Sequence, residues 1–267
     1  MVFSHDVKIP NVQIVKIDLR NLQEIKRLFQ DARPHAVIHT AAASDPDFCQ
    51  DNRTASHKIN VDVPIAIAGV CSDYEIPYVF TSTDLVFDGL NPPYREIDPV
   101  CPVNVYGEQK VLAEQGVLES YPMAAICRLP LMFGLSGPVA TSFIQPMIKA
   151  LKGGQELRLF VDEFRTPLSA RTAISGLFMS LDKVSGLIHL GGPERISRYD
   201  FGTLMAKILK TENARLIPCK HKDIETAAPR PQDVSLDSTK ALASGFRPLA
   251  LANELQEILR RAHNCLH

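Results

Sequence analysis

Tyr106 and Lys110 are the two side chains in this sequence whose types and spacing best suit proton transfer. Four residues make about one helical turn, so in a helix both side chains project from the same face. An ammonium group beside a phenol favours the phenolate and lowers the phenol pKa from about 10. Such a phenol can exchange a proton with a carbonyl or alcohol oxygen near neutral pH. Alone, however, this spacing is common on helices and only weakly specific.

Thr83 lies upstream of this pair, at the end of a short apolar segment that is typical of a strand. Its hydroxyl is suited to hold the oxygen that Tyr106 would protonate. The same segment also fits a threonine-rich turn with Asp88 and Gly89 at its tip. His39 fits a packed, hydrogen-bonded strand histidine better than a catalyst.

The elements that must position these side chains alternate between strands and helices. In the first half we expect strands over 12–17, 36–39, 78–81 and 124–128, and helices over 22–30, 54–74 and 105–119. Pro64 is expected to kink or split the second helix. In the second half we expect a helix over 141–151, a helix that begins after the N-cap Ser197 and a helix over 251–261. We expect strands over 157–160 and 187–190.

This alternation predicts an α/β fold with a parallel sheet covered on both faces. In such sheets the ligand crevice lies beyond the carboxyl ends of the strands. Four expected strand ends therefore contribute to one crevice, at Asp18, at Ala41 to Ala43, at Thr81 to Thr83 and at Leu129-Pro130.

Composition narrows the function classes. The 267 residues are 45% hydrophobic and 22% charged, as in ordinary globular proteins, and the net charge of -1 gives no basic field for nucleic acid or an anionic membrane. The six cysteines show no metal-ligand spacing, which favours reduced thiols and no metal site. No secretory signal or apolar span is visible in the sequence, so we expect a cytoplasmic protein.

The order of the motifs resembles that of the extended short-chain dehydrogenase/reductases, and within them the dTDP-4-dehydrorhamnose reductase branch. The resemblance runs through nearly the whole chain. It is carried by His39 to Ala42, Asn60-Val61, Ser82 to Gly89, Tyr94 to Pro99, Asn104 to Lys110, Arg128 to Gly134, Arg165 to Pro167 and Arg230 to Asp233. An Arg fork such as that of Arg230 suits a diphosphate, although a surface loop charge explains it equally well.

The resemblance implies a Rossmann-like, doubly wound domain over 1–155 and a smaller α+β substrate lobe over 156–267, with segments that return to the first domain. It implies reduction of a keto sugar nucleotide or a similar carbonyl substrate with NADP(H) or NAD(H). The implied catalytic residues are Thr83, Tyr106 and Lys110. The implied cofactor-binding residues are Asp18, Leu19, Ala41, Ala42, Ala43, Thr81, Tyr106, Lys110 and Leu129. The implied substrate-binding residues are Asp84, Asn104, Arg165, Arg230 and Asp233.

The sequence departs from the family in three places. No Gly-x-x-Gly-x-x-Gly turn is present, the first glycine is Gly69, and Val2-Phe3-Ser4 resembles the tail of the family's second strand. We therefore expect that about 30 residues are missing and that the chain binds a dinucleotide poorly. Leu85 and Leu131 stand where the branch often has Tyr and Trp, so aromatic stacking on a sugar is lost at both positions.

Two hypotheses follow. The first is a reductase in which Tyr106 protonates the carbonyl oxygen. A 4,6-epimerase or dehydratase is a variant of it that requires a further acid or base, which the sequence does not locate. The second is a non-catalytic regulatory protein with a protein partner, because the β subunit of methionine adenosyltransferase resembles the same branch. Either hypothesis allows a homodimer.

Overall fold

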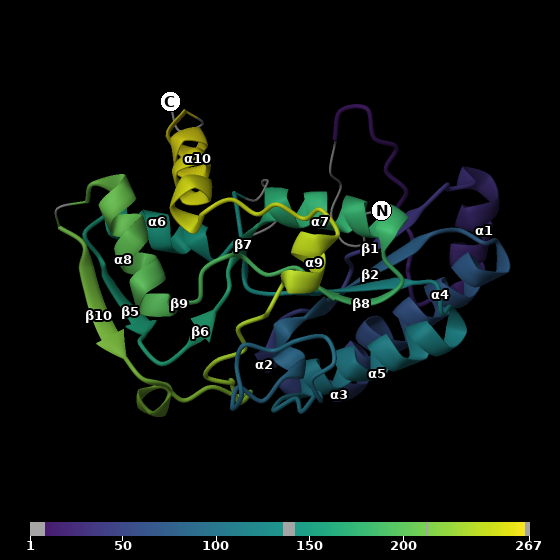
Figure 1. The fold of residues 1–267 in the computed structure, drawn as a ribbon, viewed down its shortest axis with the longest axis horizontal. Coiled ribbons are helices and arrows are strands. Elements are labelled where there is room, and N and C mark those ends of the chain that lie inside the picture. Colours follow the sequence, from purple (N-terminus) through teal and green to yellow (C-terminus); the bar gives the residue numbers. More distant parts are fainter. Residues whose placement is uncertain (1–8, 136–141, 212, 265–267) are drawn as a thin grey trace.

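The centre of the molecule is a parallel sheet. The computed structural model describes residues 9–135, 142–211 and 213–264. The sheet has the order β1-β2-β3-β8, formed by Val37–His39, Tyr78–Thr83, Ala125–Leu129 and Gly186–His189. Phe80 pairs with His39 on one side and with Ile126 on the other, so the carboxyl ends of β1, β2 and β3 meet at one edge. Figure 1 shows β1, β2 and β8 of this sheet in one half of the molecule. The predicted α/β class with a parallel sheet is confirmed.

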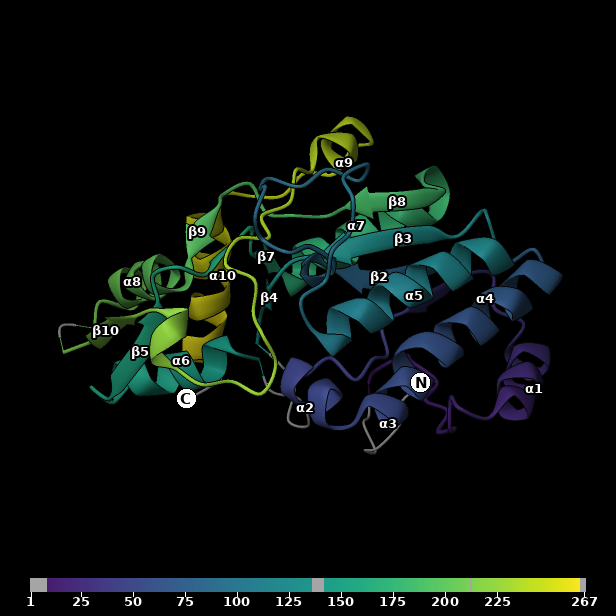
Figure 2. The same cartoon turned by 90° about the horizontal axis from the view of Figure 1, so that it is seen from below.

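Side chains of β2 alternate between the two faces of this sheet. Tyr78 and Phe80 pack against α1 (Leu22–Ala32), α4 (Val63–Asp73) and α5 (Val105–Ser120). Val79 packs on the opposite face against α7 (Ala170–Lys183) and α9 (Thr239–Ala243). Figure 2 shows α4 and α5 side by side along β2 and β3. Burial on both faces, worth about 1.5–3 kcal/mol for a large apolar side chain, fixes the position of α5 relative to the strand ends.

The helix expected over 54–74 is divided. It consists of α3 (Arg53–His57), a π-helical turn (Lys58–Asp62) and α4. The Val63 N–H donates to the Lys58 carbonyl five residues earlier, and Pro64 has no N–H with which to continue an α-helical ladder. The predicted kink or split at Pro64 thus takes the form of a π-helical turn just before the proline, within an otherwise continuous run of helix. A short helix, α2 (Pro46–Asp51), precedes it.

A second group of elements packs around its own apolar core. It contains the parallel pair β5 (Glu156–Phe160) and β10 (Arg215–Cys219), with α6 (Ile144–Lys152), α8 (Arg198–Leu209) and α10 (Leu251–Asn264). Ser197 caps α8 and its Oγ accepts the Asp200 N–H, as the sequence predicts. The proposed domain boundary at 155/156 stays a prediction.

Short strands and turns join the two groups. β4 (Met132–Phe133) pairs with β7 (Leu168–Ser169), and β6 (Phe164–Arg165) pairs with β9 (Ile196–Ser197). Two 3-10 turns, at Asp84–Val86 and His221–Asp223, complete the described elements. None of the described helices is long and apolar enough to cross a membrane.

The strand expected over 12–17 is wrong, because this segment has no regular secondary structure. β1 forms its ladder with β2, and in the described residues no strand lies beside 12–17 to accept or donate ladder hydrogen bonds. An apolar pattern alone does not make a strand without a hydrogen-bonded neighbour. Val2 to Ser4 and the expected helix start at Thr141 lie outside the described residues.

Candidate active site

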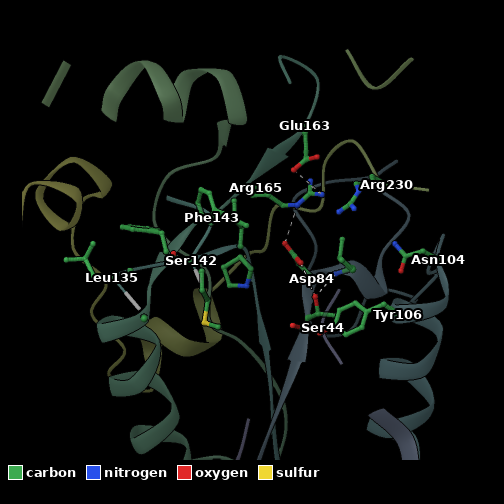
Figure 3. Close-up of a pocket in the computed structure, with 18 residues that line it drawn as sticks. Ser44, Asp84, Asn104, Tyr106, Leu135, Ser142, Phe143, Glu163, Arg165 and Arg230 are labelled. Atoms are coloured by element: carbon green, nitrogen blue, oxygen red, sulfur yellow. Dashed lines mark hydrogen bonds and ion pairs between the residues drawn. The ribbon is translucent and has the colours of Figure 1, made fainter. Parts of the chain in front are cut away.

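A cavity of about 510 Å³ opens at the carboxyl ends of β2 and β3. Thr83, Asp84, Asn104 and Tyr106 contribute to one wall, as shown in Figure 3 for three of them. The remaining lining residues are Ser44, Leu85, Pro130, Leu131, Met132, Phe133, Gly134, Leu135, Ser142, Phe143, Glu163, Arg165, Ala170 and Arg230. The structure thus brings together six of the predicted catalytic and substrate-binding residues: Thr83, Asp84, Asn104, Tyr106, Arg165 and Arg230.

Tyr106 is placed by the N-terminus of α5. Asn104 is the N-cap, and its Oδ1 accepts the Gly107 N–H at 2.9 Å while its Nδ2 donates to the Pro229 carbonyl at 3.0 Å. Both ends of the Asn104 amide are therefore engaged in holding this helix start. Its predicted contact with substrate stays a prediction.

Gly107 lets α5 approach the turn that follows Thr83. A Cβ on Gly107 would lie 2.3 Å from the Leu85 carbonyl oxygen and 2.8 Å from the Pro102 Cβ. Both distances are far below van der Waals contact, and the first neighbour is backbone. Glycine at this position therefore sets the distance between the hydroxyls of Tyr106 and Thr83.

Gly107→Ala is expected to destabilise the protein by about 1–3 kcal/mol and to weaken ligand binding in the cavity, because the helix start must move away from Leu85. Gly69→Ala is the matched control, since Gly69 lies in α4 with no heavy atom within 4 Å of its added Cβ. That control should gain up to about 1 kcal/mol from helix propensity. Urea unfolding of both variants measures the difference, and equal stabilities would contradict the prediction.

Lys110 is buried one turn beyond Tyr106. Its Nζ donates to the Thr81 carbonyl at 2.7 Å and lies 4.0 Å from the centroid of the Phe80 ring. Burial lowers the pKa of Lys110 to about 7, against an opposing effect of the Glu114 carboxylate. The ammonium is thus tied to the strand end rather than to the phenol.

The pKa of Tyr106 corrects the sequence-based expectation. Burial raises the Tyr106 pKa well above its usual value, and the nearby carboxylate of Asp84 raises it further. A hydrogen bond with Thr83 opposes this shift only partly. The prediction that Lys110 lowers the Tyr106 pKa is wrong, because burial disfavours the phenolate and the ammonium faces Thr81. Tyr106 is consequently a protonated phenol at neutral pH, suited to donate.

Lys110 should make stability depend on pH. The unfolded chain keeps the proton on this lysine up to about pH 10.4, whereas the folded chain releases it near pH 7. Between these values the unfolded state binds more protons, so the lysine's contribution to stability rises with pH, by at most about 1.4 kcal/mol per unit. Urea unfolding of wild type and Lys110→Met at several pH values should show this rise only in the wild type. Parallel curves would contradict it.

Asp84 lines the cavity wall and is buried, with 3% of the residue exposed. Its Oδ1 accepts the Thr83 hydroxyl at 3.2 Å, and its Oδ2 lies 3.6 Å from the Arg165 Nε. Burial raises the pKa of Asp84 to about 6, while Arg165 acts in the opposite direction. Asp84 Oδ2 has no hydrogen-bond partner among the described residues.

Arg165 is fixed by its own chain. Its guanidinium donates to the carbonyls of Phe164 at 2.7 Å, Gln232 at 3.3 Å and Pro231 at 3.2 Å. Arg230, on the same loop, pairs with Asp47 of α2 at 2.9 Å. Arg165 therefore holds the loop over 231–232 against the cavity, and Arg230 ties that loop to α2 across it. Their predicted contacts with substrate stay predictions.

Glu163 is the cavity residue that sequence reasoning missed. Its carboxylate lies 3.2 Å from His221, 3.7 Å from Arg198 and 3.8 Å from Arg165. Burial acts to raise its pKa, but the hydrogen bond from His221 and the two guanidinium charges outweigh it and hold the pKa at about 2. An available signal was its spacing, because Glu163 precedes Arg165 by two residues and an extended chain places both on one face.

Other predicted site residues lie outside this cavity. Asp233 accepts from Arg195 at 2.6 Å, and Asp18 forms an exposed pair with Arg20. Leu19 and Ala41 line a separate cavity of about 290 Å³ beside β1. The remaining predicted cofactor residues Ala42, Ala43, Thr81, Lys110 and Leu129 do not line the main cavity either.

Two buried side chains, Asn60 and His39, hydrogen-bond the backbone that follows β1. Asn60 bonds both the N–H and the carbonyl of Ala43, at 2.8 and 3.0 Å, and so fixes the segment after β1. His39 is buried between Tyr78 and the Ala41 carbonyl, at 3.1 and 3.0 Å, and burial lowers its pKa to about 4. The prediction that His39 is a packed, hydrogen-bonded histidine is confirmed.

Comparisons with known proteins identify relatives of this chain. The model of the RmlD substrate binding domain matches residues 3–264. The "Probable low-salt glycan biosynthesis reductase Agl14" of Haloferax volcanii is 30% identical over 226 residues, which are 83% of this chain and 75% of that protein. The "Methionine adenosyltransferase 2 subunit beta" of Pongo abelii is 26% identical over 238 residues, or 86% of this chain and 71% of that protein.

A solved structure shows the same fold. The dTDP-4-dehydrorhamnose reductase of Bacillus anthracis, crystallised in complex with NADP, superposes with a TM-score of 0.85 at 23% identity. The match covers 92% of this chain and 87% of that one. The Rossmann-like arrangement predicted from the motifs is therefore confirmed.

Proposed function

Because this chain belongs to the RmlD substrate binding domain family, we propose that it binds a keto sugar nucleotide, or a similar carbonyl compound, for reduction by a nicotinamide cofactor. One observation carries the proposal. A protonated phenol, Tyr106, shares a wall of the cavity with the Thr83 hydroxyl, at the strand ends where α/β folds bind ligands.

Each residue of this wall has a role in the proposed reaction. Tyr106 donates its proton to the carbonyl oxygen of the substrate. Thr83 exchanges its hydrogen bond to Asp84 for one to the same oxygen and so orients the carbonyl. Lys110 holds the end of β2 through the Thr81 carbonyl and thereby keeps both hydroxyls at the cavity.

The end of β1 fits the flat nicotinamide ring of a cofactor, which when bound would supply the hydride. Ala41 to Ala43 have small side chains and are at least partly exposed, so a flat ring could approach the backbone there, whereas Lys110 is buried with its ammonium on the Thr81 carbonyl. In the part of the chain that the structure describes, no glycine-rich turn joins a strand to a helix. The fit therefore extends to the nicotinamide ring and not to the pyrophosphate.

The test is cofactor oxidation. Purified protein with dTDP-4-dehydrorhamnose should consume NADPH or NADH, followed by the loss of its absorbance. Calorimetry with the sugar nucleotide alone measures binding to the cavity. Binding of the sugar nucleotide without oxidation of either cofactor would restrict the function to ligand binding, and absence of both binding and oxidation would contradict the proposal.

A regulatory role is the second candidate, and the similarity to methionine adenosyltransferase 2 subunit beta favours it. In that case the surface around the cavity would serve a protein partner. Titration of this chain into a methionine adenosyltransferase catalytic subunit, followed by size-exclusion chromatography, tests it. Unchanged elution of both proteins would exclude this candidate.

A further inference from the structure

Asp84 gives the cavity a carboxylate that reduction does not require. Asp84 lines the cavity together with Tyr106, and its buried Oδ2 has no hydrogen-bond partner among the described residues. Figure 3 shows the Asp84 carboxylate between Arg165 on one side and Tyr106 on the other. A buried polar atom without a partner is costly and calls for an explanation in the function of the site.

Arg165 favours the ionised form of Asp84 but does not occupy the hydrogen-bonding capacity of its Oδ2. The Arg165 Nε is 3.6 Å from Oδ2, within ion-pair range but beyond a good hydrogen bond. Three backbone carbonyls bind the other guanidinium nitrogens, so Arg165 is held where it is. Thr83 bonds Oδ1 and leaves Oδ2 as the atom with free lone pairs.

Glu163 is the other described carboxylate in the cavity, and its surroundings differ. His221, Arg198 and Arg165 surround its two oxygens, and its pKa is held at about 2. Such a carboxylate is a weak base. Burial gives Asp84 a pKa of about 6, which makes it a stronger base than an ordinary carboxylate while it remains ionised at neutral pH.

We propose that this cavity also catalyses enolisation of its carbonyl ligand, with Asp84 Oδ2 as the base that removes a proton from the carbon next to the carbonyl. The C–H electron pair becomes a carbon–carbon double bond, and the carbonyl electron pair moves to the oxygen. That oxygen takes the proton of Tyr106, and the Thr83 hydroxyl holds it. The reverse step returns the proton from Asp84 to the carbon, so no oxidant or reductant is needed.

This inference rests on the proposed function only for the binding of the carbonyl by Tyr106 and Thr83. It does not depend on hydride transfer. It also supplies the additional base that an epimerase variant of the fold would require and that the sequence alone did not locate. The activity should therefore be visible without any nicotinamide cofactor.

The experiment is solvent exchange. dTDP-4-dehydrorhamnose is incubated with the protein in D₂O without cofactor, and NMR follows the proton signals of the ring carbons that flank the carbonyl. Wild type should exchange them faster than protein-free solution, and Asp84→Asn should lose at least about 100-fold of that rate. Asp51→Asn, an exposed carboxylate at the end of α2, is the matched control and should exchange as wild type.

The pH dependence of the exchange rate in the wild type provides a second test, which does not require the Asp84→Asn variant to fold. In the wild type the exchange rate should rise across about pH 6 and then level, as Asp84 loses its proton. The charged or titratable groups around it are Arg165, Glu163 and Tyr106. A flat profile, or Asp84→Asn that binds the sugar nucleotide and exchanges at the wild-type rate, would overturn the inference.

The two proposals can fail separately. Wild type that binds the sugar nucleotide but does not accelerate exchange overturns the enolisation and leaves the proposed function intact. Wild type that does not bind the sugar nucleotide by calorimetry overturns both. Exchange without cofactor oxidation supports the enolisation and counts against the reductase.

Discussion

Tyr106→Phe is expected to lower carbonyl reduction by about 100- to 10,000-fold while the folded structure is retained. The substitution removes one oxygen from a side chain that is 8% exposed, and the ring keeps its packing against Cys49 and Val105. No neighbouring group in the described cavity wall readily replaces the lost proton donor. The single hydroxyl proton of Thr83 is donated to Asp84, and the Asp84 carboxyl beside it is ionised at neutral pH. The measurement is the rate of cofactor oxidation with saturating dTDP-4-dehydrorhamnose.

Tyr74→Phe is the matched control. Tyr74 follows α4 and is 53% exposed, so the same change there should leave the rate within a factor of two of wild type. Thermal unfolding of both variants separates chemistry from folding. A Tyr106→Phe variant with the wild-type rate would show that another group protonates the oxygen and would remove the main support for the proposed function.

The sheet was predictable from the sequence because its strands carry their own signal. Tyr78 to Thr83 alternates between two buried faces, and the helix after Asn104 carries an N-cap and a helical spacing. These are local patterns of period two and about 3.6, which the sequence displays directly. The segment over 12–17 shows the limit of this reasoning. It has a strand-like composition, but a strand also needs a neighbour, and pairing is a property of the fold.

The sequence predicted six residues that line the cavity but not their electrostatic arrangement. Tyr106 and Lys110 lie one turn apart as expected, yet burial reverses the expected shift of the Tyr106 pKa. Sequence spacing does not report whether an ammonium faces a phenol or a backbone carbonyl. Glu163 was missed for a similar reason, because its partners His221 and Arg198 are distant in sequence and meet it only in the folded chain.

Arg128→Met is expected to destabilise the folded protein by about 3–5 kcal/mol, the largest stability effect that the structure predicts. Arg128 is 2% exposed and forms a two-bond pair with Glu114, with Nε at 3.0 Å and Nη2 at 2.7 Å from its oxygens. Without Arg128, the Glu114 carboxylate keeps one hydrogen bond among the described residues, from the Ser82 hydroxyl, and the electrostatic interaction with Lys110. Such a loss is a large part of the roughly 5–15 kcal/mol that stabilises a typical domain.

Two further variants decide whether the loss comes from an uncompensated charge. Arg171 pairs with Glu257 at a similar distance of 3.0 Å, but both side chains are more than half exposed, so Arg171→Met should cost less than about 1 kcal/mol. Arg128→Met combined with Glu114→Leu removes both buried charges and should recover most of the stability. Urea unfolding measures all three. If the double variant is no more stable than Arg128→Met, then the packing of Arg128 against the Phe87 ring and its contact with His189, rather than its charge, account for its contribution to stability. In that case α5, which carries Tyr106 and Lys110, is held by its apolar packing and by hydrogen bonds such as that of Lys110 to the Thr81 carbonyl, and not by this ion pair.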